Sequence, residues 1–428
     1  MEYAGITCTK GWDEGTQEYY PGLVEKADFV IIQRDFPRFV EVYEKIITAA
    51  RAAGKPVVFD IDDLLWELPE THFDMRRRRY TESILPMFKA IIEADLVTTS
   101  SAALRDRLKD LNQNTVVLPN YLDDRLWVKD NEREYGNHQP IVLGYMGSPT
   151  HAIDIKFLEP VLQKLVKRYH SKIVLHMYGF PPPVWLRQTI RTELTRFSHT
   201  SYEQFARGFQ KASFDIALAP LAPIPFNQCK SSIKYLEYSA LGVPGVYSNT
   251  PAYCSLIQHG KDGFIATTVD EWEAQLVQLI EDERLRKSIG RKARDKVFNS
   301  WMVSQHAGEW HDCYNKLLKA PRIDKRQSTL YKLMDAAGRF RQDADQYRID
   351  KLELDLKNLN RYTDQVREVL EKTSADFKSY QTRSAAHIQE LEAQIERDHN
   401  LWVAVQNSRT WKMTNGLNNL LIKARLKK

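Results

Sequence analysis

The sequence predicts an α/β protein of two Rossmann-like domains, followed by a coiled coil and a basic amphipathic tail. Three observations lead to this prediction. Apolar strands alternate with helical patterns through residues 29–119, residues 214–249 form a strand, loop, helix and second strand in sequence pattern, and heptads begin at Ile349. At 428 residues and 43% hydrophobic, the chain has room for two hydrophobic cores and an extension.

The N-terminal domain is expected to span residues 1–130. Strands that are apolar throughout and separated by helices indicate a parallel sheet that is covered on both faces. The first clear strand starts only at Phe29, with Ile6 to Thr9 as a weak candidate before it. We therefore expect a shortened sheet, either because the domain is trimmed or because another chain completes it. The strands are expected at 29–33, 56–61, 96–100 and 116–119, with helices at 39–53, up to about 93, and at 102–111.

The second domain, expected over residues 138–300, holds the most informative segment. A buried strand at 214–218 leads through a Pro-containing loop into a helix that opens on Lys230, Ser231 and Ser232. Such a helix begins at the carboxyl end of a parallel sheet, where open α/β folds bind ligands. Unpaired N–H groups and the positive end of the helix dipole suit a diphosphate there. Glu237, further along the helix, can accept hydrogen bonds from a ribose diol.

Lys230 is the leading candidate among these residues. A phosphate leaving group needs a fixed positive charge when no metal is bound, and a Lys at a helix N-terminus is otherwise poorly placed against the dipole. Lys234 follows one turn later. It is either a second ligand of the phosphates or a solvated surface residue.

A glycine-containing turn is expected after the strand that begins at Ile141. Gly144, Gly147 and Ser148 would allow the backbone to approach a phosphate, although a short Gly turn alone is a weak indication. His151 comes next, at the start of a helix, where it either faces the same site or merely caps the helix.

Three acids, Asp60, Asp62 and Asp63, stand at the carboxyl end of the strand predicted at 56–61. Acids this close repel one another unless they bind a cation, a basic partner or hydroxyl groups, so a polar ligand is inferred. The alternative is that Asp62 or Asp63 caps the next helix while Asp60 pairs with an Arg. We favour the ligand site, because carboxylates at strand ends of α/β folds cluster at sites.

The second domain resembles the donor-binding half of retaining GT-B glycosyltransferases of the family-four, or group 1, type. The pieces occur in family order over roughly residues 140 to 300. They are FDIALAPLAPIPFNQCKSSIKYLEYSALGVPGVYSN at 214–249, IVLGYMGSPT at 141–150, IVLHMYG at 173–179 and HGKDGFIAT at 259–267. One departure stands out: Cys229 occupies the position, eight before Glu237, where the family usually carries a Glu that touches the donor sugar. The segment DIDD at 60–63 also resembles bacterial polysaccharide glycosyltransferases.

The resemblance implies a metal-independent, cofactor-free transferase that moves a sugar from a nucleotide diphosphate to a glycan or lipid-linked acceptor of a bacterial surface polysaccharide. Lys230, Ser231, Ser232 and the Gly147 turn would stabilise the departing diphosphate, Asp62 and Asp63 would be catalytic together with Lys230, and Tyr178 and Gly179 would border the base. Residues 301–320 would form a helix that crosses back onto the first domain. The alternative is a non-catalytic GT-B-like scaffold, which Cys229 and the short amino end favour. A different GT-B enzyme, such as an epimerase, has no specific support.

Composition narrows the setting of the protein. Four cysteines far apart, with no CxxC pair, indicate neither zinc nor a disulfide framework and fit a reducing cytoplasm. No signal peptide and no run of about 18 apolar residues is visible in the sequence. The net charge is +5, but the segment 400–428 carries six basic residues and no acid, which leaves the remainder near neutral. Such a balance argues against a nucleic-acid-binding protein.

Residues 339–398 are expected to form a coiled coil that makes a homo-oligomer. Apolar positions alternate by three and four from Ile349 to Tyr380, and a stutter follows through Ser384 to Ile388. A single helix lying on the globular domains is the alternative.

The tail at 400–428 combines Trp402 and Trp411 with its basic residues, which is typical of an interfacial helix at the inner face of the cell membrane, with a docking helix for a partner as the rival. Arg76 to Arg79 are either a solvated helix face or a contact for a lipid-linked phosphate.

Overall fold

The computed structural model describes residues 2–13, 15–16, 18–69, 83–129, 140–196, 201–321, 324–377, 392–398 and 400. These residues divide into two compact units, 1–331 and 332–428. Three predictions lie outside the described residues: the Arg76 to Arg79 contact, the stutter through Ser384 to Ile388, and the amphipathic tail beyond residue 400.

The first sheet is parallel, as predicted, and has the order β3-β4-β5-β6. Neighbouring strands pair in register, for example Ile32 with Phe59 and Phe59 with Val97. The expected early strand at Ile6 to Thr9 is absent: residues 6–9 are not extended into a ladder, and a small antiparallel pair follows them instead. The elements are β1 (Trp12–Asp13), β2 (Glu18–Tyr19), β3 (Val30–Gln33), α2 (Val40–Ala52), β4 (Val57–Ile61), α4 (Ile84–Glu93), β5 (Leu96–Thr99), α5 (Ala102–Leu108) and β6 (Thr115–Val117).

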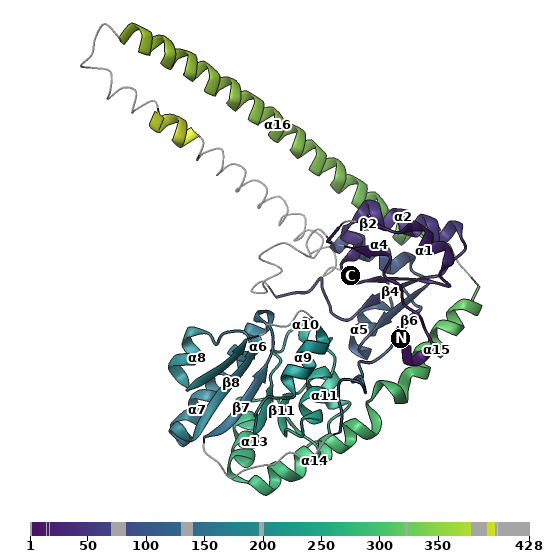
Figure 1. The fold of residues 1–428 in the computed structure, drawn as a ribbon, viewed down its shortest axis with the longest axis vertical. Coiled ribbons are helices and arrows are strands. Elements are labelled where there is room, and N and C mark those ends of the chain that lie inside the picture. Colours follow the sequence, from purple (N-terminus) through teal and green to yellow (C-terminus); the bar gives the residue numbers. More distant parts are fainter. Residues whose placement is uncertain are drawn as a thin grey trace. The chain divides into compact units, whose positions relative to one another are not determined.

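The second sheet contains six parallel strands in the order β12-β11-β10-β7-β8-β9 (Figure 1). Its chain order reverses beside β7, and open α/β folds bind ligands at the carboxyl edge beside such a reversal. The strands are β7 (Ile141–Met146), β8 (Ile173–Gly179), β9 (Thr192–Arg196), β10 (Ile216–Ala219), β11 (Gly245–Ser248) and β12 (Phe264–Ala266).

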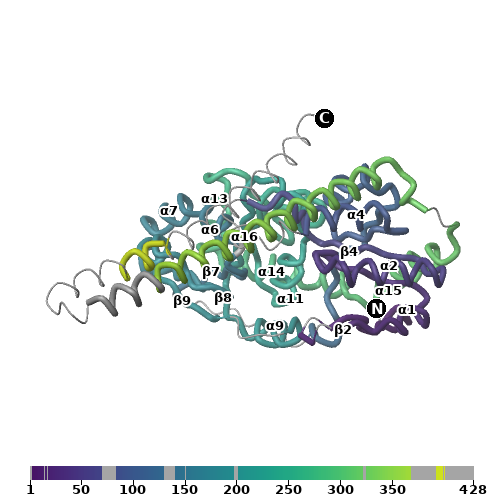
Figure 2. The backbone as a smooth tube through the Cα atoms, turned by 90° about the horizontal axis from the view of Figure 1, so that it is seen from above, coloured from purple at the N-terminus to yellow at the C-terminus, as the bar shows by residue number. Residues whose placement is uncertain are grey.

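Helices cover both faces of this sheet because successive side chains of a strand point to opposite sides. Leu143 and Tyr145 face one hydrophobic core, whereas Met146 faces the other. Figure 2 shows α7 (Glu159–Tyr169) and α13 (Val269–Glu281) on one side of the strands and α9 (Tyr202–Phe209) on the other. Helices α11 (Ile233–Ala240) and α14 (Glu283–Ser300) share a core with α9.

Helix α15 (Val303–Lys319) returns from the second domain to the first (Figure 1). Its residues Tyr314 and Leu317 are buried against Val58 of the first sheet, and the Tyr314 ring lies 4.7 Å from that of Phe29.

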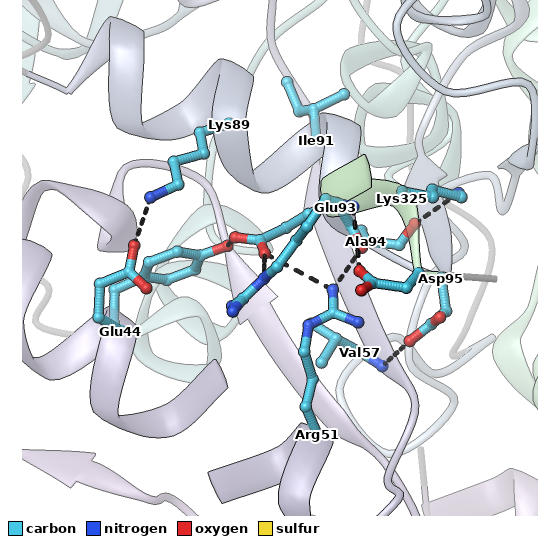
Figure 3. Close-up of polar contacts among 12 residues, drawn as sticks. Glu44, Arg51, Val57, Lys89, Ile91, Glu93, Ala94, Asp95 and Lys325 are labelled. Atoms are coloured by element: carbon cyan, nitrogen blue, oxygen red, sulfur yellow. Dashed lines mark hydrogen bonds and ion pairs between the residues drawn. The ribbon is translucent and has the colours of Figure 1, made fainter. Parts of the chain in front are cut away.

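After α15 the chain is fixed to the first domain around a buried carboxylate (Figure 3). Glu93, at the end of α4, is fully buried and accepts hydrogen bonds from Tyr43 Oη at 2.7 Å and Arg326 Nε at 2.8 Å. Arg51 Nη2 lies 3.5 Å from the same carboxylate. Lys325 Nζ donates a hydrogen bond to the backbone carbonyl oxygen of Ala94, at 2.7 Å. The short 3-10 helix η5 (Lys325–Gln327) is thereby held against α4.

In the second unit, α16 (Thr329–Phe377) is one long helix that begins ten residues before the predicted coiled coil. Ile395 and Asp398, from the described helical residues 392–398, line one cavity with Leu356 and Leu359 of α16. The association of this unit with another chain stays a prediction. None of the helices that the structure describes is long and apolar enough to cross a membrane.

Candidate active site

Lys230 lies where the two domains of the first unit meet. Its Nζ atom is 2.8 Å from Oδ1 of Asp63 and lies 4.2 Å from the centre of the Phe226 ring. Both charged side chains are about four-fifths buried, at 18% and 19% exposure. Helix α11 starts at Ile233, so Lys230, like the two serines after it, precedes the helix. Lys230 therefore lies three residues before the helix rather than at its start, and its acidic partner was not predicted.

The residues on either side of Lys230 are also bound to the first domain. Ser101 Oγ donates to the carbonyl oxygen of Cys229 at 2.7 Å, and Asn120 Nδ2 donates to Ser231 Oγ at 3.0 Å. Three consecutive residues of the second domain thus each have a partner in the first.

Cys229 provides an apolar contact between the domains. Its side chain is 2% exposed and belongs to the hydrophobic core of the first domain, which includes Leu64 and Leu104. Burial raises the pKa of its thiol to about 11. A Glu at this position would place a charge among apolar side chains, which is costly, although the Arg107 charge also acts on this position. The missing family acid therefore has a packing explanation.

The acids of the first domain have partners that the sequence did not reveal. Asp60 accepts hydrogen bonds from Thr98 Oγ1 at 2.6 Å and Gln33 Nε2 at 3.1 Å. The Arg pair expected for Asp60 is instead made by its neighbours: Arg34 contacts Asp62, and Arg34 Nη2 lies 3.8 Å from Asp63 Oδ2. The only sequence signal for Arg34 is its place directly after β3, in register with the residue after Asp60.

The two remaining acids differ in pKa. Burial, together with the neighbouring Asp63 carboxylate, raises the pKa of Asp62. Burial also acts on Asp63, but Lys230 and Arg34 outweigh it and hold the pKa of Asp63 below its usual value. The Asp63 carboxylate is therefore protonated at a lower pH than that of Asp62.

A second lysine lies deeper in the same region. Lys234 is 8% exposed, and its Nζ has no hydrogen-bond partner among the described residues, although it lies 5.2 Å from the centre of the Tyr145 ring. Burial lowers its pKa to about 8. The alternative of a solvated surface residue is wrong for Lys234. A buried ammonium group without a hydrogen-bonding partner indicates a candidate anion-binding site.

His151 points toward this lysine rather than capping its helix. Its Nδ1 atom lies 2.8 Å from Asp154 Oδ2, and no side-chain capping bond is made. Burial and the Lys234 charge lower the pKa of His151 to about 4, so the ring is neutral at physiological pH. Asp154 Oδ1 accepts hydrogen bonds from the Ala222 N–H at 2.9 Å and from Asn227 Nδ2 at 2.6 Å. These bonds fix the loop that leads to Lys230.

Glu237 is buried at 3% exposure and accepts a hydrogen bond from Tyr202 Oη at 3.1 Å. Burial raises the pKa of Glu237 to about 8. Tyr202 is 45% exposed and also accepts from Trp127 Nε1 at 3.3 Å. Tyr202, which the sequence did not single out, therefore connects the carboxylate expected for the ribose to the surface.

The glycines of the turn after β7 serve packing and backbone hydrogen bonding more than was predicted. A Cβ atom on Gly144 would lie 2.0 Å from the Phe214 ring, so this glycine serves close packing and not the approach of a phosphate. The Gly147 N–H already donates to the Tyr178 carbonyl oxygen at 3.0 Å. Tyr178 itself is buried, and Gly179 after it has a φ of +129°, which suits glycine alone.

Ser148 and Ser232 each stand at a helix start. Ser148 directly precedes the 3-10 helix at Pro149–His151 and Ser232 precedes α11, and neither makes a side-chain capping bond. The described residues contain no group of three His, Cys, Asp or Glu side chains that could hold a metal ion.

The two parallel sheets and the site between them define a protein of the GT-B class of folds. The catalytic domain of starch synthase IV from Arabidopsis thaliana, bound to ADP and acarbose, superposes with a TM-score of 0.50 at 12% identity, covering 71% of this chain and 77% of that one. Sucrose-phosphate synthase from Thermosynechococcus elongatus also reaches 0.50, at 13% identity, over 70% of this chain and 78% of that one. These similarities show the fold alone.

The family comparison is more specific, and it concerns the second domain. Residues 140–282 match the family "Glycosyl transferases group 1". The N-acetyl-alpha-D-glucosaminyl L-malate synthase of Bacillus anthracis is 22% identical over 240 residues, which are 54% of this chain. The match spans 61% of that protein's length. The family comparison and the fold together support the resemblance to group 1 glycosyltransferases of GT-B fold.

Proposed function

We propose that the chain is a retaining, metal-independent glycosyltransferase that needs no cofactor and moves a hexose from a nucleotide diphosphate sugar. The observation that carries this proposal is the pair of lysines at the edge of the second sheet. Lys234 is buried without a hydrogen-bond partner, and Lys230 is one helical turn before it. Two fixed ammonium groups beside a helix N-terminus suit a diphosphate. The group 1 match over the same residues supports this reading.

In the proposed reaction, the diphosphate is the group on which negative charge develops. Lys230 and Lys234 stabilise it as it leaves, which is the kind of electrostatic stabilisation that contributes most in such steps. The hydroxyl groups of Ser231 and Ser232 and the backbone N–H of Ser148, which follows Gly147, supply further donors. A helix start that is not capped by its own side chains has N–H groups for a phosphate oxygen.

The rest of the nucleotide is assigned to the second domain and the acceptor to the first. Glu237, with Tyr202, holds the ribose, while Tyr178 and Gly179 at the end of β8 border the base. Asp62 and Asp63 belong to the acceptor side, since they come from the first domain.

The proposed acceptor is a glycan or a lipid-linked intermediate of a bacterial surface polysaccharide, such as O-antigen or capsule. In this proposal the residues from 339 to 398 form a homo-oligomer, and the tail holds the protein at the inner face of the cytoplasmic membrane. Neither nucleic acid nor a metal has a role in it.

The second candidate function is a non-catalytic GT-B-like subunit of a polysaccharide-synthesis complex. The observation that favours it is the engagement of Lys230, whose charge is already paired with Asp63. Ligand binding separates the two candidates, because a scaffold has no need to bind nucleoside diphosphates.

The test is calorimetric titration of the full-length protein with UDP, ADP and pyrophosphate. We expect Lys230→Ala to weaken diphosphate binding by about 1.5 to 3 kcal/mol, the usual effect of losing a hydrogen bond to a charged group. Lys287→Ala is the matched control, because that lysine pairs with Glu283 on α14 at 2.7 Å and is half exposed. Glu237→Gln should weaken nucleoside diphosphates but not pyrophosphate. Unchanged binding in Lys230→Ala would remove the assignment of the donor site.

A further inference from the structure

Four charged side chains form a continuous row of ion pairs across the two domains of the first unit. Asp62 contacts Arg34, Arg34 Nη2 lies 3.8 Å from Asp63 Oδ2, and Asp63 Oδ1 lies 2.8 Å from Lys230 Nζ. Each oxygen of the Asp63 carboxylate therefore faces a different cation, one from each domain. This row of ion pairs carries two positive and two negative charges.

Arg34 is held in this position by an unusual backbone conformation. Its φ is +49°, in the left-handed region that non-glycine residues rarely adopt. Its N–H donates to the carbonyl oxygen of Asp60 at 2.9 Å. A conformation of this kind costs free energy and persists where the surroundings determine it, which is common at functional sites. The turn directs the guanidinium toward the two acids that follow β4.

A diphosphate bound by Lys230 would share its ammonium group, which has three N–H donors, with Asp63. A phosphate oxygen within hydrogen-bonding distance of Nζ would lie close to the Asp63 carboxylate, and like charges repel strongly in a partly buried site. The lysine backbone cannot easily withdraw, because its neighbours Cys229 and Ser231 are bonded to the first domain. The Asp63 side chain is the part that can turn, and the second cation beside it is Arg34.

We propose that Arg34 is a positioning residue for this site: it takes over the Asp63 carboxylate when a diphosphate binds Lys230. The exchange breaks the ion pair between the domains and strengthens the one within the first domain. Donor binding is thereby linked to the contact between the two domains. This inference rests on the proposed function, because it requires Lys230 to bind the diphosphate.

The test is a double-mutant cycle read by calorimetric titration of the full-length protein with pyrophosphate and with UDP. We expect Asp63→Asn to bind both ligands about five- to tenfold more tightly, because the competing carboxylate is gone. We expect Arg34→Gln to bind them several-fold more weakly, because Asp63 loses its second cation, and Arg34→Lys to restore part of the affinity. In the Asp63→Asn background, Arg34→Gln should have no further effect.

The control is Glu67→Gln, which removes one acid from the same region. Glu67 is near Arg107, at 3.5 Å, and is not among the partners of Lys230, so its replacement should leave affinity unchanged. Melting temperatures of all variants check that each protein is folded.

Each result has one meaning. If Lys230→Ala binds pyrophosphate as tightly as the wild type, the donor site fails and the exchange with it. If Lys230→Ala loses binding while Asp63→Asn does not gain it, the donor site stands and the exchange is refuted. If Arg34→Gln weakens binding equally with and without Asp63, Arg34 does not act through that acid and the inference is overturned.

Discussion

Replacing Arg326 with Met is expected to destabilise the first unit although Arg326 lies far along the chain from the acid it serves. The change removes the 2.8 Å bond from Arg326 Nε to Glu93, a carboxylate with no exposed surface (Figure 3). Taking one partner from a buried ion pair costs about 3 to 5 kcal/mol when the charge is left alone. Here Tyr43 still donates at 2.7 Å and Arg51 remains at 3.5 Å. The loss is therefore nearer to one charge-assisted hydrogen bond, about 2 kcal/mol.

This magnitude can be expressed as a melting temperature. Unfolding entropy is about 2.1 cal/mol/K per residue, so the unit of residues 1–331 has about 0.7 kcal/mol/K. A loss of about 2 kcal/mol then lowers the melting temperature by about 3 °C. Differential scanning calorimetry of the full-length protein, with urea unfolding as a second measurement, gives the required precision.

The matched control is Arg207→Met on α9. Arg207 pairs with Glu203 at 2.9 Å, but both side chains are more than half exposed, at 67% and 58%. Exposed pairs of this kind contribute little, so we expect less than about 0.5 kcal/mol. If Arg326→Met melts like Arg207→Met, the buried network does not fix the segment before α16, and the argument from burial is refuted.

Three further outcomes are expected. Affinity for nucleoside diphosphates should fall as pH rises through about 8, because Lys234, with a pKa of about 8, loses its charge. Lys234→Met should flatten this profile, and a wild-type profile that is level from pH 7 to 9 would contradict the assignment. The full-length chain should self-associate through the heptads from Ile349 to Ile395. A chain ending at residue 335, which keeps the Glu93 network, should form a smaller particle that is folded and binds UDP. A full-length monomer in sedimentation at micromolar concentration would exclude the coiled coil. Liposomes with anionic lipid should retain the full chain at low salt and release it at high salt, because screening removes the contribution of the basic residues; equal retention of a chain ending at His399 would place any anchor elsewhere.

Periodicity explains what the sequence could predict. The strand at 57–61 is apolar except for Asp60, and a parallel sheet covered on both faces buries such runs. The helix after Lys230 was equally readable, because the change from an apolar strand to a loop and then to a helical pattern is local. These features depend on neighbours within one element.

The contacts that decide the chemistry are not local. Lys230 and Asp63 are 167 residues apart in the sequence, and nothing in either segment specifies the other. The burial of Lys234 depends on the Tyr145 ring beneath it, and Gly144 is required because the Phe214 ring, from the segment before β10, fills the place of a Cβ atom. Each of these contacts joins segments that are far apart in the sequence. The hydrophobic periodicity of one segment does not reveal which other segment packs against it.

Cys229 connects the local sequence pattern with the contacts between distant segments. A thiol there lets the segment before α11 pack into the first domain, and the packing places Lys230 beside Asp63. A carboxylate at 229 would have had to be buried among the apolar side chains of the first domain, which costs free energy. The acid nearest to the candidate donor lysine therefore comes from the first domain, and it reaches the lysine only while the domains touch. On this argument, the affinity of the site for a diphosphate depends on how strongly the two domains hold each other.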